Sequence, residues 1–576
     1  MTRVHRIRGV AGAGKTYQSM QRVAELRDEE GYTASDFRFV SFSRSHAADL
    51  ENDVLDAWRD RLERLDDDQA RQVEETLIDS VSTLHSLCSR LTNTPRIITP
   101  ESDAEFYQDF WRRRGFEFDA SESPSAYLDP DEMDSSERGR VEQLLAADQL
   151  LAALGAGLDG EGLGLVPASL GHIPVEIDLH AARVVELIRE WRTHKLENGV
   201  KEHHDYILDA ANSEKTPDCR VLVVDEMQDY SPLEYAVVRD WIRSGDLDHV
   251  ILAGDEFQSI YGFKLADSTY FTGLEVNDED VLTESYRCPR AVCRVARSVC
   301  PPTRITSARS DEGRVLDAST QTPEDLASLV QQLLADHPVD AYEADPTSVF
   351  LLTRTNRQAA KVGWALRRTG IPYTSTVDGE ESPWTEDVLN AIETLRLAAS
   401  GGCAVSTDAA DPLIDMATNS KDRREMAEAP SFGSLDVDSV SAVDIWTAFP
   451  DCDSATDIIR TLDVDDYIAE MIQGALHSDA DLTPGLVEVG TIHSVKGREA
   501  PAVVVLDGYP HRLSERYQAD NEFAEEEDRL AYVAATRARA TLVVAREFLG
   551  GSSFPPFEPP LERVAESSPA GGVIHQ

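Results

Sequence analysis

The sequence predicts an α/β protein whose sheets are parallel and flanked by helices, and three observations support this prediction. Four apolar residues at 221–224 are typical of a buried parallel strand. A glycine-rich segment at 9–16 lies between a strand-like alternation and a helical pattern. Further apolar runs of strand length alternate with helical patterns, which favours βαβ units and therefore parallel sheets.

The first predicted strand, at 4–8, leads into a phosphate-loop motif and then a helical pattern at 17–26. The motif G-x-x-x-x-G-K-[ST] is matched at every position by Gly9, Val10, Ala11, Gly12, Ala13, Gly14, Lys15 and Thr16. Its glycines let backbone N–H groups turn toward phosphate oxygens at a helix N-terminus. We expect Lys15 to reach the β- and γ-phosphates and the Thr16 hydroxyl to bind Mg²⁺. The alternative, a Gly/Ala-rich turn that contains a lysine, does not explain the strand–loop–helix context.

Two carboxylates, Asp225 and Glu226, directly follow the strand at 221–224. Ligands of open α/β sheets bind at the carboxyl ends of the strands. We expect Asp225 to hold Mg²⁺, directly or through water, and Glu226 to orient a water for attack on a γ-phosphate. An acidic pair after a strand is also typical of helix caps and loops, so this prediction depends on the phosphate loop.

Later segments also contain a predicted strand that is followed directly by polar or aromatic residues. The strand that begins at 250 leads into Gln258, which is placed to sense a γ-phosphate, and into Tyr261 and Phe263, whose rings suit base stacking. The run 282–287 sets Tyr286 beside Arg287.

Two more runs, 491–499 and 526–538, precede apolar strands at 502–506 and 540–544. With its motifs in this order the chain resembles the UvrD/Rep family of superfamily 1 helicases, from its first residues to about 545. Two shorter matches, 41–44 and 82–86, fall in suitable places.

This resemblance implies two RecA-like P-loop NTPase domains, each carrying a mostly helical insertion. The implied ranges are 1–92 and 186–279 for the first RecA-like domain, 93–185 for its insertion, 280–378 and 484–550 for the second RecA-like domain, 379–483 for its reduced insertion, and 551–576 for a disordered tail.

The resemblance also implies an ATP site that closes between the two domains, with ATP and Mg²⁺ as cofactors. Arg287 and Arg537 would come from the second domain as cationic groups on the γ-phosphate, where such arginines raise rates by roughly 10³–10⁵ in related NTPases. Tyr286 would stack on adenine, Glu499 would contact the ribose, and Gln258 would link nucleotide to DNA. The implied nucleotide-contacting residues are the eight of the phosphate loop with Tyr17, Tyr286, Arg287, Glu499 and Arg537, and the implied catalytic residues are Lys15, Asp225, Glu226, Gln258, Arg287 and Arg537.

Five aromatic or histidine positions match those that touch single-stranded DNA in the family. Stacking of bases on aromatic rings is worth roughly 1–3 kcal/mol per base and is indifferent to sequence. Each ring taken singly has a core residue as its alternative. The five positions are Phe42, His85, Tyr261, Phe263 and His493.

The implied activity is that of an ATP-dependent DNA helicase or translocase that moves 3′→5′, with single-stranded and tailed duplex DNA as partners. The alternative is a DNA-gated ATPase that acts as a sensor or remodelling subunit, which the short second insertion keeps open. That insertion is also a possible contact for a protein partner. A non-hydrolysing homologue is disfavoured because all phosphate and metal groups are present.

The chain departs from the family pattern in several places. Only eight residues precede the phosphate loop, so the family's N-terminal glutamine element for adenine is missing, which bears on selectivity among nucleotides. Arg498 and Ala500 replace apolar residues beside Glu499, and Arg44 stands where asparagine is common. We expect no nuclease domain after the last motif.

The composition is strongly acidic, with 105 Asp and Glu against 55 Lys and Arg and a formal net charge of −50. Only eight of the basic residues are lysines. At molar salt the Debye length is about 3 Å and self-repulsion is screened, so we expect a high-salt cytoplasm. No run of 18 apolar residues, signal peptide or paired cysteine pattern is evident, which disfavours a membrane span and an oxidising compartment.

Two further groups suggest metal ligands at first sight. Cys288, Cys293 and Cys300 are one sulfur short of the usual four, so we interpret them as small apolar residues. The adjacent pair His203 and His204 has no matching third ligand in the sequence, and we interpret it as solvated surface.

Overall fold

The structure is a computed structural model that describes residues 2–92, 96–118, 139–157, 165–173, 175, 177–338, 347–376, 382–401, 404–417, 439–476, 478, 483 and 485–557. The chain divides into two compact units. Unit 1 is Met1–Glu312 with Arg516–Thr536, and unit 2 is Gly313–Glu515 with Arg537–Gln576. Each unit contains one six-stranded parallel sheet, which confirms the predicted α/β class and is consistent with two RecA-like domains.

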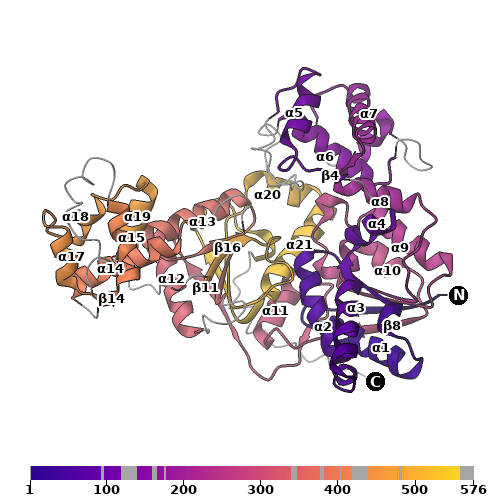
Figure 1. The fold of residues 1–576 in the computed structure, drawn as a ribbon, viewed down its shortest axis with the longest axis horizontal. Helices are drawn as coiled ribbons and strands as arrows, with labels where there is room; N and C mark the ends of the chain where they lie inside the picture. Colours follow the sequence, from indigo (N-terminus) through magenta and orange to yellow (C-terminus); the bar gives the residue numbers. More distant parts are fainter. Residues whose placement is uncertain are drawn as a thin grey trace. The chain divides into compact units, whose positions relative to one another are not determined.

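The sheet of unit 1 has the strand order β3-β2-β6-β7-β1-β8. Its edge strand β8 is labelled in Figure 1. All of its pairings are parallel, so the carboxyl ends of its strands meet at one edge. That edge carries the phosphate loop after β1 and the two carboxylates after β6. The strands are β1 (Arg3–Gly9), β2 (Phe37–Ser41), β3 (Val81–Thr83), β6 (Val221–Val224), β7 (His249–Gly254) and β8 (Asp278–Leu282).

Helices cover both faces of this sheet because its central strands are apolar on both sides. Val221 and Val223 of β6 belong to one hydrophobic core, whereas Leu222 and Val224 belong to another, as the alternation along a strand requires. The helices of unit 1 outside its insertion are α1 (Lys15–Glu29), α2 (Arg44–Leu62), α3 (Asp67–Ser80), α4 (Leu84–Thr92), α8 (His203–Ala211), α9 (Pro232–Ser244), α10 (Ser268–Gly273), α11 (Arg290–Val299) and α21 (Asn521–Thr536). The short strands β9 (Glu284–Ser285) and β10 (Thr306–Ser307) pair beside them.

The insertion of unit 1 has a core of its own, packed around Tyr107, Trp111 and Trp191. Its elements are β4 (Arg96–Ile97), α5 (Ala104–Arg112), α6 (Arg140–Ala153), α7 (Ala181–Glu197) and β5 (Val200–Lys201). Helix α7 runs past the predicted boundary at residue 185, and its buried residues as far as Trp191 belong to this core.

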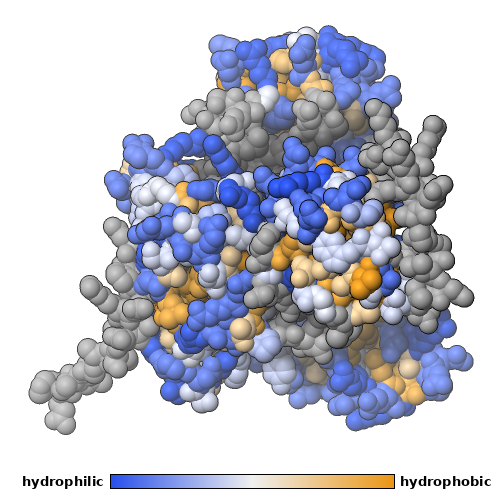
Figure 2. All heavy atoms as spheres, turned by 90° about the vertical axis from the view of Figure 1, so that its left-hand side faces the viewer, coloured by the Kyte–Doolittle hydropathy of each residue, from blue (hydrophilic) through white to orange (hydrophobic). Residues whose placement is uncertain are grey.

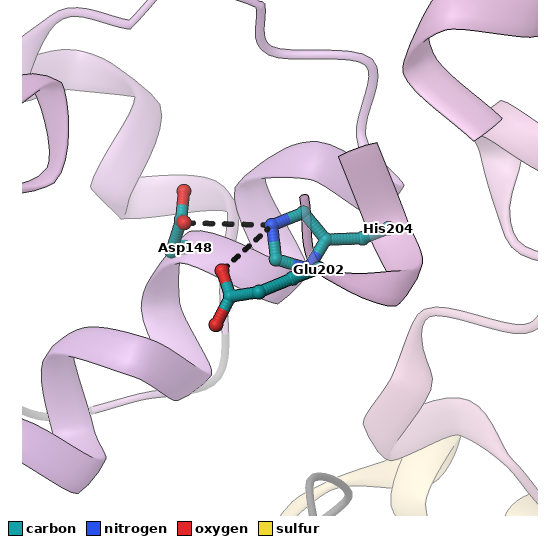
Figure 3. A group of neighbouring side chains, drawn as sticks. All are labelled: Asp148, Glu202 and His204. Atoms are coloured by element: carbon teal, nitrogen blue, oxygen red, sulfur yellow. Dashed lines mark ion pairs between the residues drawn. The ribbon is translucent and has the colours of Figure 1, made fainter. Parts of the chain in front are cut away.

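The interpretation of His204 as solvated surface was wrong. Its side chain is only 13% exposed, and its Nε2 lies 3.4 Å from Asp148 Oδ2 and 3.7 Å from Glu202 Oε2 (Figure 3). The Lys195 ammonium lies 2.5 Å from Glu202 Oε2 and 2.7 Å from Asp205 Oδ2. Sequence reasoning missed this cluster because Asp148 is far from His204 in the chain and reaches it only through the packing of α6 on α8.

Two cations offset part of the negative charge of this cluster. Burial alone would raise the pKa of the Asp148 carboxyl, but Arg192 and Lys195 hold it well below its usual range. Arg192 Nε donates to Asp148 Oδ1 at 2.5 Å, and both residues are almost completely buried. Although Asp148, Glu202 and His204 lie close enough together to hold a cation, the position between the carboxylates is next to the Lys195 ammonium.

The sheet of unit 2 has the order β11-β18-β17-β12-β16-β13, and its pairings are also parallel. The predicted strands at 502–506 and 540–544 correspond to β17 and β18. The strands are β11 (Arg314–Ser319), β12 (Val349–Thr353), β13 (Thr374–Ser375), β16 (Val487–Thr491), β17 (Ala500–Leu506) and β18 (Ala538–Arg546).

The second insertion shares one hydrophobic core with this sheet. A Cβ on Gly370, at the end of α13, would lie 2.1 Å from the backbone of Ala475 in α19, so these two helices approach as closely as backbones allow. The helices of unit 2 are α12 (Pro323–Asp336), α13 (Asn356–Thr369), α14 (Glu386–Ser400), α15 (Thr407–Ala417), α17 (Ala442–Ala448), α18 (Ala455–Ile459) and α19 (Asp466–Leu476); α20 (His511–Ala519) spans the boundary with unit 1. β14 (Val405–Ser406) and β15 (Ser439–Val440) form an antiparallel pair.

The predicted disordered tail begins too early. Phe554 and Phe557 are 3% and 0% exposed, and the Phe554 N–H donates to Asp507 Oδ1 at 2.6 Å. These two rings anchor 551–557 to unit 2. The rest of the predicted tail, 558–576, and the predicted loop at 429–434 lie outside the described residues.

On the face drawn in Figure 2, hydrophilic residues cover most of the described surface, and hydrophobic residues form smaller patches between them. Within the described ranges, no helix combines the length and the apolar character that crossing a bilayer requires.

Candidate nucleotide site and aromatic cluster

The phosphate loop adopts a conformation that depends on two glycines. Gly12 and Gly14 have φ values of 68° and 79°, in the left-handed region that side chains with a Cβ disfavour. Gly14 is the N-cap of α1, so the loop leads directly into the N-terminus of that helix. Lys15 is 8% exposed, and a Cβ on Gly9 would lie 2.7 Å from its Cγ, so the lysine stem crosses over the start of the loop.

Tyr286 and Arg287 lie against this loop in unit 1. The Tyr286 N–H donates to Gly12 O at 2.9 Å, and a Cβ on Gly12 would lie 2.4 Å from Arg287 Cβ. The Tyr286 side chain is 68% exposed, as is that of Tyr17. The predicted boundary at residue 280 would have assigned Arg287 to the second domain, whereas these contacts place it in unit 1.

Asp225 and Thr16 approach each other at the carboxyl edge of the sheet. The Thr16 hydroxyl donates to Asp225 Oδ2 at 3.3 Å, and the Glu226 N–H donates to Asp225 Oδ1 at 2.9 Å. Burial, followed by the neighbouring Glu226, raises the pKa of Asp225 to about 7, while Lys15 opposes the shift. A hydroxyl beside a buried carboxylate whose charge Lys15 offsets only in part fits Mg²⁺, which prefers oxygen ligands.

Gln228 is a functional candidate that sequence reasoning missed. It is completely buried, and its Nε2 donates to a Glu226 carboxylate oxygen while its Oε1 accepts the Asp255 N–H at 3.1 Å. Its backbone oxygen accepts the Ser259 hydroxyl at 3.0 Å. Gln228 therefore joins the loop after β6 to the loop after β7. Its position in the run that contains Asp225 and Glu226 is the signal that could have found it.

Gln258 is held on the second of these loops by Asp255. Its Nε2 donates to Asp255 Oδ2 at 2.8 Å. Tyr532, on α21, donates its hydroxyl to the same oxygen at 3.2 Å and accepts the Ala11 N–H of the phosphate loop at 2.9 Å. Burial raises the pKa of Asp255 to about 6, although Lys15 and Gln258 oppose the shift.

Three of the five predicted DNA-contacting residues form an aromatic cluster in unit 1. The rings of Phe42 and Tyr261 stack with centroids 5.2 Å apart and an interplanar angle of 22°. Phe263 meets Tyr261 edge-on at 5.9 Å. Lys264, which was not predicted, places its Nζ 4.9 Å from the Tyr261 centroid and 5.6 Å from that of Phe263.

The His85 ring meets the Tyr206 ring edge-to-face, with the two centroids 5.8 Å apart. Its Nδ1 is 3.7 Å from Glu234 Oε1. Burial lowers the pKa of His85, and Glu234 opposes the shift.

The remaining predicted residues belong to unit 2. Arg537 is 1% exposed and donates from its guanidinium to Arg498 O at 3.0 Å. Glu499 lies 3.8 Å from the guanidinium of Arg539, and His493 follows the end of β16.

Cys288, Cys293 and Cys300 are buried, which is consistent with their interpretation as small apolar residues. The Cys293 thiol donates to Cys288 O at 3.6 Å, and the Cys288 thiol donates to Thr536 O at 3.5 Å.

Three protein-family models match the chain. The model of an AAA domain matches residues 1–264, and that of a UvrD-like helicase C-terminal domain matches residues 452–547. The model of a viral superfamily 1 RNA helicase core domain matches residues 175–358.

Individual relatives are distant. The chain is 27% identical to the ATP-dependent DNA helicase UvrD2 of Mycobacterium tuberculosis over 361 residues, covering 58% of this chain and 49% of that protein. It is 21% identical to the ATP-dependent DNA helicase PcrA of Staphylococcus epidermidis over 630 residues, covering 93% of this chain and 80% of that protein. The chain thus spans about half the length of UvrD2 and most of the length of PcrA.

Substitution of Gly12 by alanine should weaken nucleotide binding by about tenfold or more, a loss of about 1.4 kcal/mol. The new Cβ would collide with Arg287 in addition to the strain of a positive φ. The measurement is titration with a fluorescent nucleotide. Gly31→Ala is the control, since Gly31 has a φ of 81° and open space around it. Equal affinities of the two variants would contradict the close packing of Arg287 on the loop.

Proposed function

The chain belongs to the UvrD-like family of superfamily 1 helicases, and we propose on that basis that it is an ATP-dependent DNA translocase that moves 3′→5′ and unwinds tailed duplex DNA. The observation that carries this proposal is the convergence at one sheet edge of the phosphate loop, the Thr16–Asp225 contact and Gln258. The aromatic cluster begins three residues after Gln258, which supports a link between the nucleotide and the strand. The polarity follows the resemblance of the segment 258–263 to the family.

The proposed chemistry is transfer of the γ-phosphoryl group of ATP to water. Lys15 would neutralise charge on the β- and γ-phosphates, and Thr16 and Asp225 would hold Mg²⁺, which when bound offsets further phosphate charge. Glu226 would orient the attacking water, whose oxygen bonds to the γ-phosphorus as the bond to the bridging oxygen breaks. The proton of that water would pass to the Glu226 carboxylate and then to solvent.

The two arginines proposed to act on the γ-phosphate, Arg287 and Arg537, belong to different units. Arg287 is already packed beside the phosphate loop, whereas Arg537 belongs to unit 2. We propose that both stabilise negative charge that develops on the γ-phosphate, so that full activity requires both units. Tyr286 would stack on adenine, for which its large exposed area is suited, and Glu499 would contact the ribose.

A second candidate function is a DNA-gated ATPase that senses or remodels DNA with little unwinding of its own. The close approach of α13 and α19 at Gly370 favours it, because this contact fixes the second insertion to its sheet. A strand-displacement assay on 3′-tailed and 5′-tailed duplexes separates the two. Unwinding of the 3′-tailed substrate supports the translocase, and DNA-stimulated ATP turnover without unwinding supports the sensor.

Lys15→Ala and Glu226→Gln should each abolish ATP turnover, for different reasons. Loss of the Lys15 charge should weaken nucleotide binding. Glu226→Gln removes the water-orienting carboxylate but leaves Asp225 and Thr16 in place, so ATP should still bind. Phosphate release and nucleotide titration, measured in parallel, check this separation. Near-wild-type hydrolysis by either variant would contradict the proposed active site.

Removal of the rings of Tyr261 and Phe263 together should eliminate most of the stimulation of ATP turnover by single-stranded DNA. Loss of base stacking at roughly 1–3 kcal/mol per base accounts for the effect. Basal turnover without DNA should persist, because neither ring belongs to the phosphate loop or to the carboxylate pair at 225 and 226. Tyr235→Ala with Tyr270→Ala is the matched control, since these two tyrosines form a separate stacked pair in unit 1. A double variant at 261 and 263 that still responds fully to DNA would exclude this cluster as the stacking site.

Lowering KCl from molar to ~0.1 M should lower the midpoint of thermal unfolding, because the Debye length rises from about 3 to about 10 Å. The net charge of −50 would then repel itself over longer distances. Melting curves across a KCl series test this, with sucrose as a non-ionic control that stabilises by exclusion rather than by screening. A midpoint that stays flat or rises as salt is removed would rule out salt adaptation as the reason for the acidic composition.

A further inference from the structure

One face of α21 makes three polar contacts along the segment 255–262. Tyr532 donates to Asp255 at 3.2 Å, the Arg529 Nε donates to Ser259 O at 2.9 Å, and Glu526 Oε1 accepts the Gly262 N–H at 2.8 Å. The three residues are spaced three apart, so they lie along one side of the helix. The helix therefore follows this segment over its whole length.

The segment joins the two halves of the proposed machinery. It begins at Asp255, which holds Gln258, and it ends inside the turn that carries Tyr261 and Phe263. Within that turn the Lys264 N–H donates to Tyr261 O at 2.8 Å, and Leu265 has a φ of 65°. The positions of the two rings are therefore fixed by a tight turn whose centre is Gly262.

Gly262 approaches Glu526 so closely that a side chain would interfere. A Cβ at this position would lie 2.6 Å and 2.8 Å from the two carboxylate oxygens of Glu526. Glycine at 262 is therefore what allows the carboxylate to reach the backbone N–H. At the other end of the helix face, Tyr532 also accepts the Ala11 N–H of the phosphate loop.

We propose that Glu526, Arg529 and Tyr532 are positioning residues that transmit the state of the nucleotide site to the aromatic cluster, by holding the phosphate loop, Gln258 and the ring-bearing turn on one helix face. This inference rests on the proposed function as a DNA-stimulated ATPase. None of the three residues needs to touch ATP or DNA for this role. Their effect should therefore appear in the coupling between the two ligands rather than in the binding of either one.

The test compares Glu526→Ala with Glu525→Ala, because Glu525 is an adjacent and exposed residue of the same type on the same helix. Both variants should keep basal ATP turnover and single-stranded DNA affinity within about threefold of wild type. Stimulation of turnover by DNA should fall to about a third or less in Glu526→Ala and stay unchanged in Glu525→Ala. Glu526→Gln should retain stimulation, since its amide oxygen can still accept the Gly262 N–H.

A variant on the partner side keeps the test informative if Glu526→Ala unfolds. Gly262→Ala leaves the carboxylate intact but displaces it, and it should reproduce the loss of stimulation. If DNA stimulates ATP turnover in wild type and equally in both Glu526→Ala and Gly262→Ala, the coupling role is overturned and the proposed function is not. Absence of stimulation in wild type would overturn the proposed function together with it. A loss of DNA affinity equal to the loss of stimulation would make Glu526 part of the DNA-binding surface and would also overturn the coupling role.

Tyr532→Phe tests the other end of the helix face. It removes the hydroxyl but keeps the ring, which packs edge-on against Phe257 at 6.1 Å. We expect reduced DNA stimulation with ATP affinity within about threefold of wild type, because this hydroxyl joins Ala11 to Asp255 and contacts neither ligand in the proposed role. Tyr517→Phe is the control, since it removes a tyrosine hydroxyl that donates to Asp528 of the same helix α21 at 2.9 Å. Matching kinetics of the two tyrosine variants would remove Tyr532 from the proposal.

Discussion

Buried charge at the carboxyl edge of the first sheet is the constraint on which the rest of unit 1 depends. Lys15 and Asp255 are almost inaccessible to solvent, and burying such groups is unfavourable unless hydrogen bonds or opposite charges compensate. Gln258 and Tyr532 supply part of that compensation by donating to the Asp255 carboxylate, and Gln228 connects the Asp255 backbone N–H to a Glu226 carboxylate oxygen. As a result, the loops after β1, β6 and β7 are tied to one another, and a change at one of them alters the surroundings of the others.

In the insertion of unit 1, buried charges are likewise compensated by opposite charges and hydrogen bonds. Three carboxylates, Asp148, Glu202 and Asp205, face Arg192 and Lys195 with little exposure to solvent. Removal of one partner from such a network leaves an uncompensated buried charge, so the network acts as a unit. His204 borders it, and an ammonium group already lies where a metal ion would otherwise balance the carboxylates. We therefore interpret the cluster as a structural ion-pair network that connects α6, α7 and α8.

The sequence was sufficient for the parts that depend on local patterns. Apolar runs and glycine spacing predict the phosphate loop, the order of the motifs and the strands at 221–224, 502–506 and 540–544, which the two parallel sheets contain. Short or polar strands such as β8 and β13 were not predicted. The partners of His204 and the burial of Phe554 and Phe557 depend on contacts between distant segments, which periodicity does not encode. Lys264 and the polar face of α21 were missed for the same reason, whereas Gln228 could have been found from its place beside Asp225 and Glu226. Each is an ordinary polar residue until its partner is known.

The proposed stacking surface offers a physical reason why so acidic a chain could bind DNA. Lysines are scarce in this sequence, yet one of the eight lies at the phosphate loop and another lies over the rings of Tyr261 and Phe263. Contacts to DNA phosphates gain much of their strength from counterion release and weaken steeply as salt rises. Stacking of bases on rings has no such dependence on released ions, so a surface led by Phe42, Tyr261 and Phe263 would keep its affinity where a lysine-lined groove would lose it. In a molar-salt solvent, a few cations at fixed positions beside aromatic rings would therefore serve better than a broad basic patch.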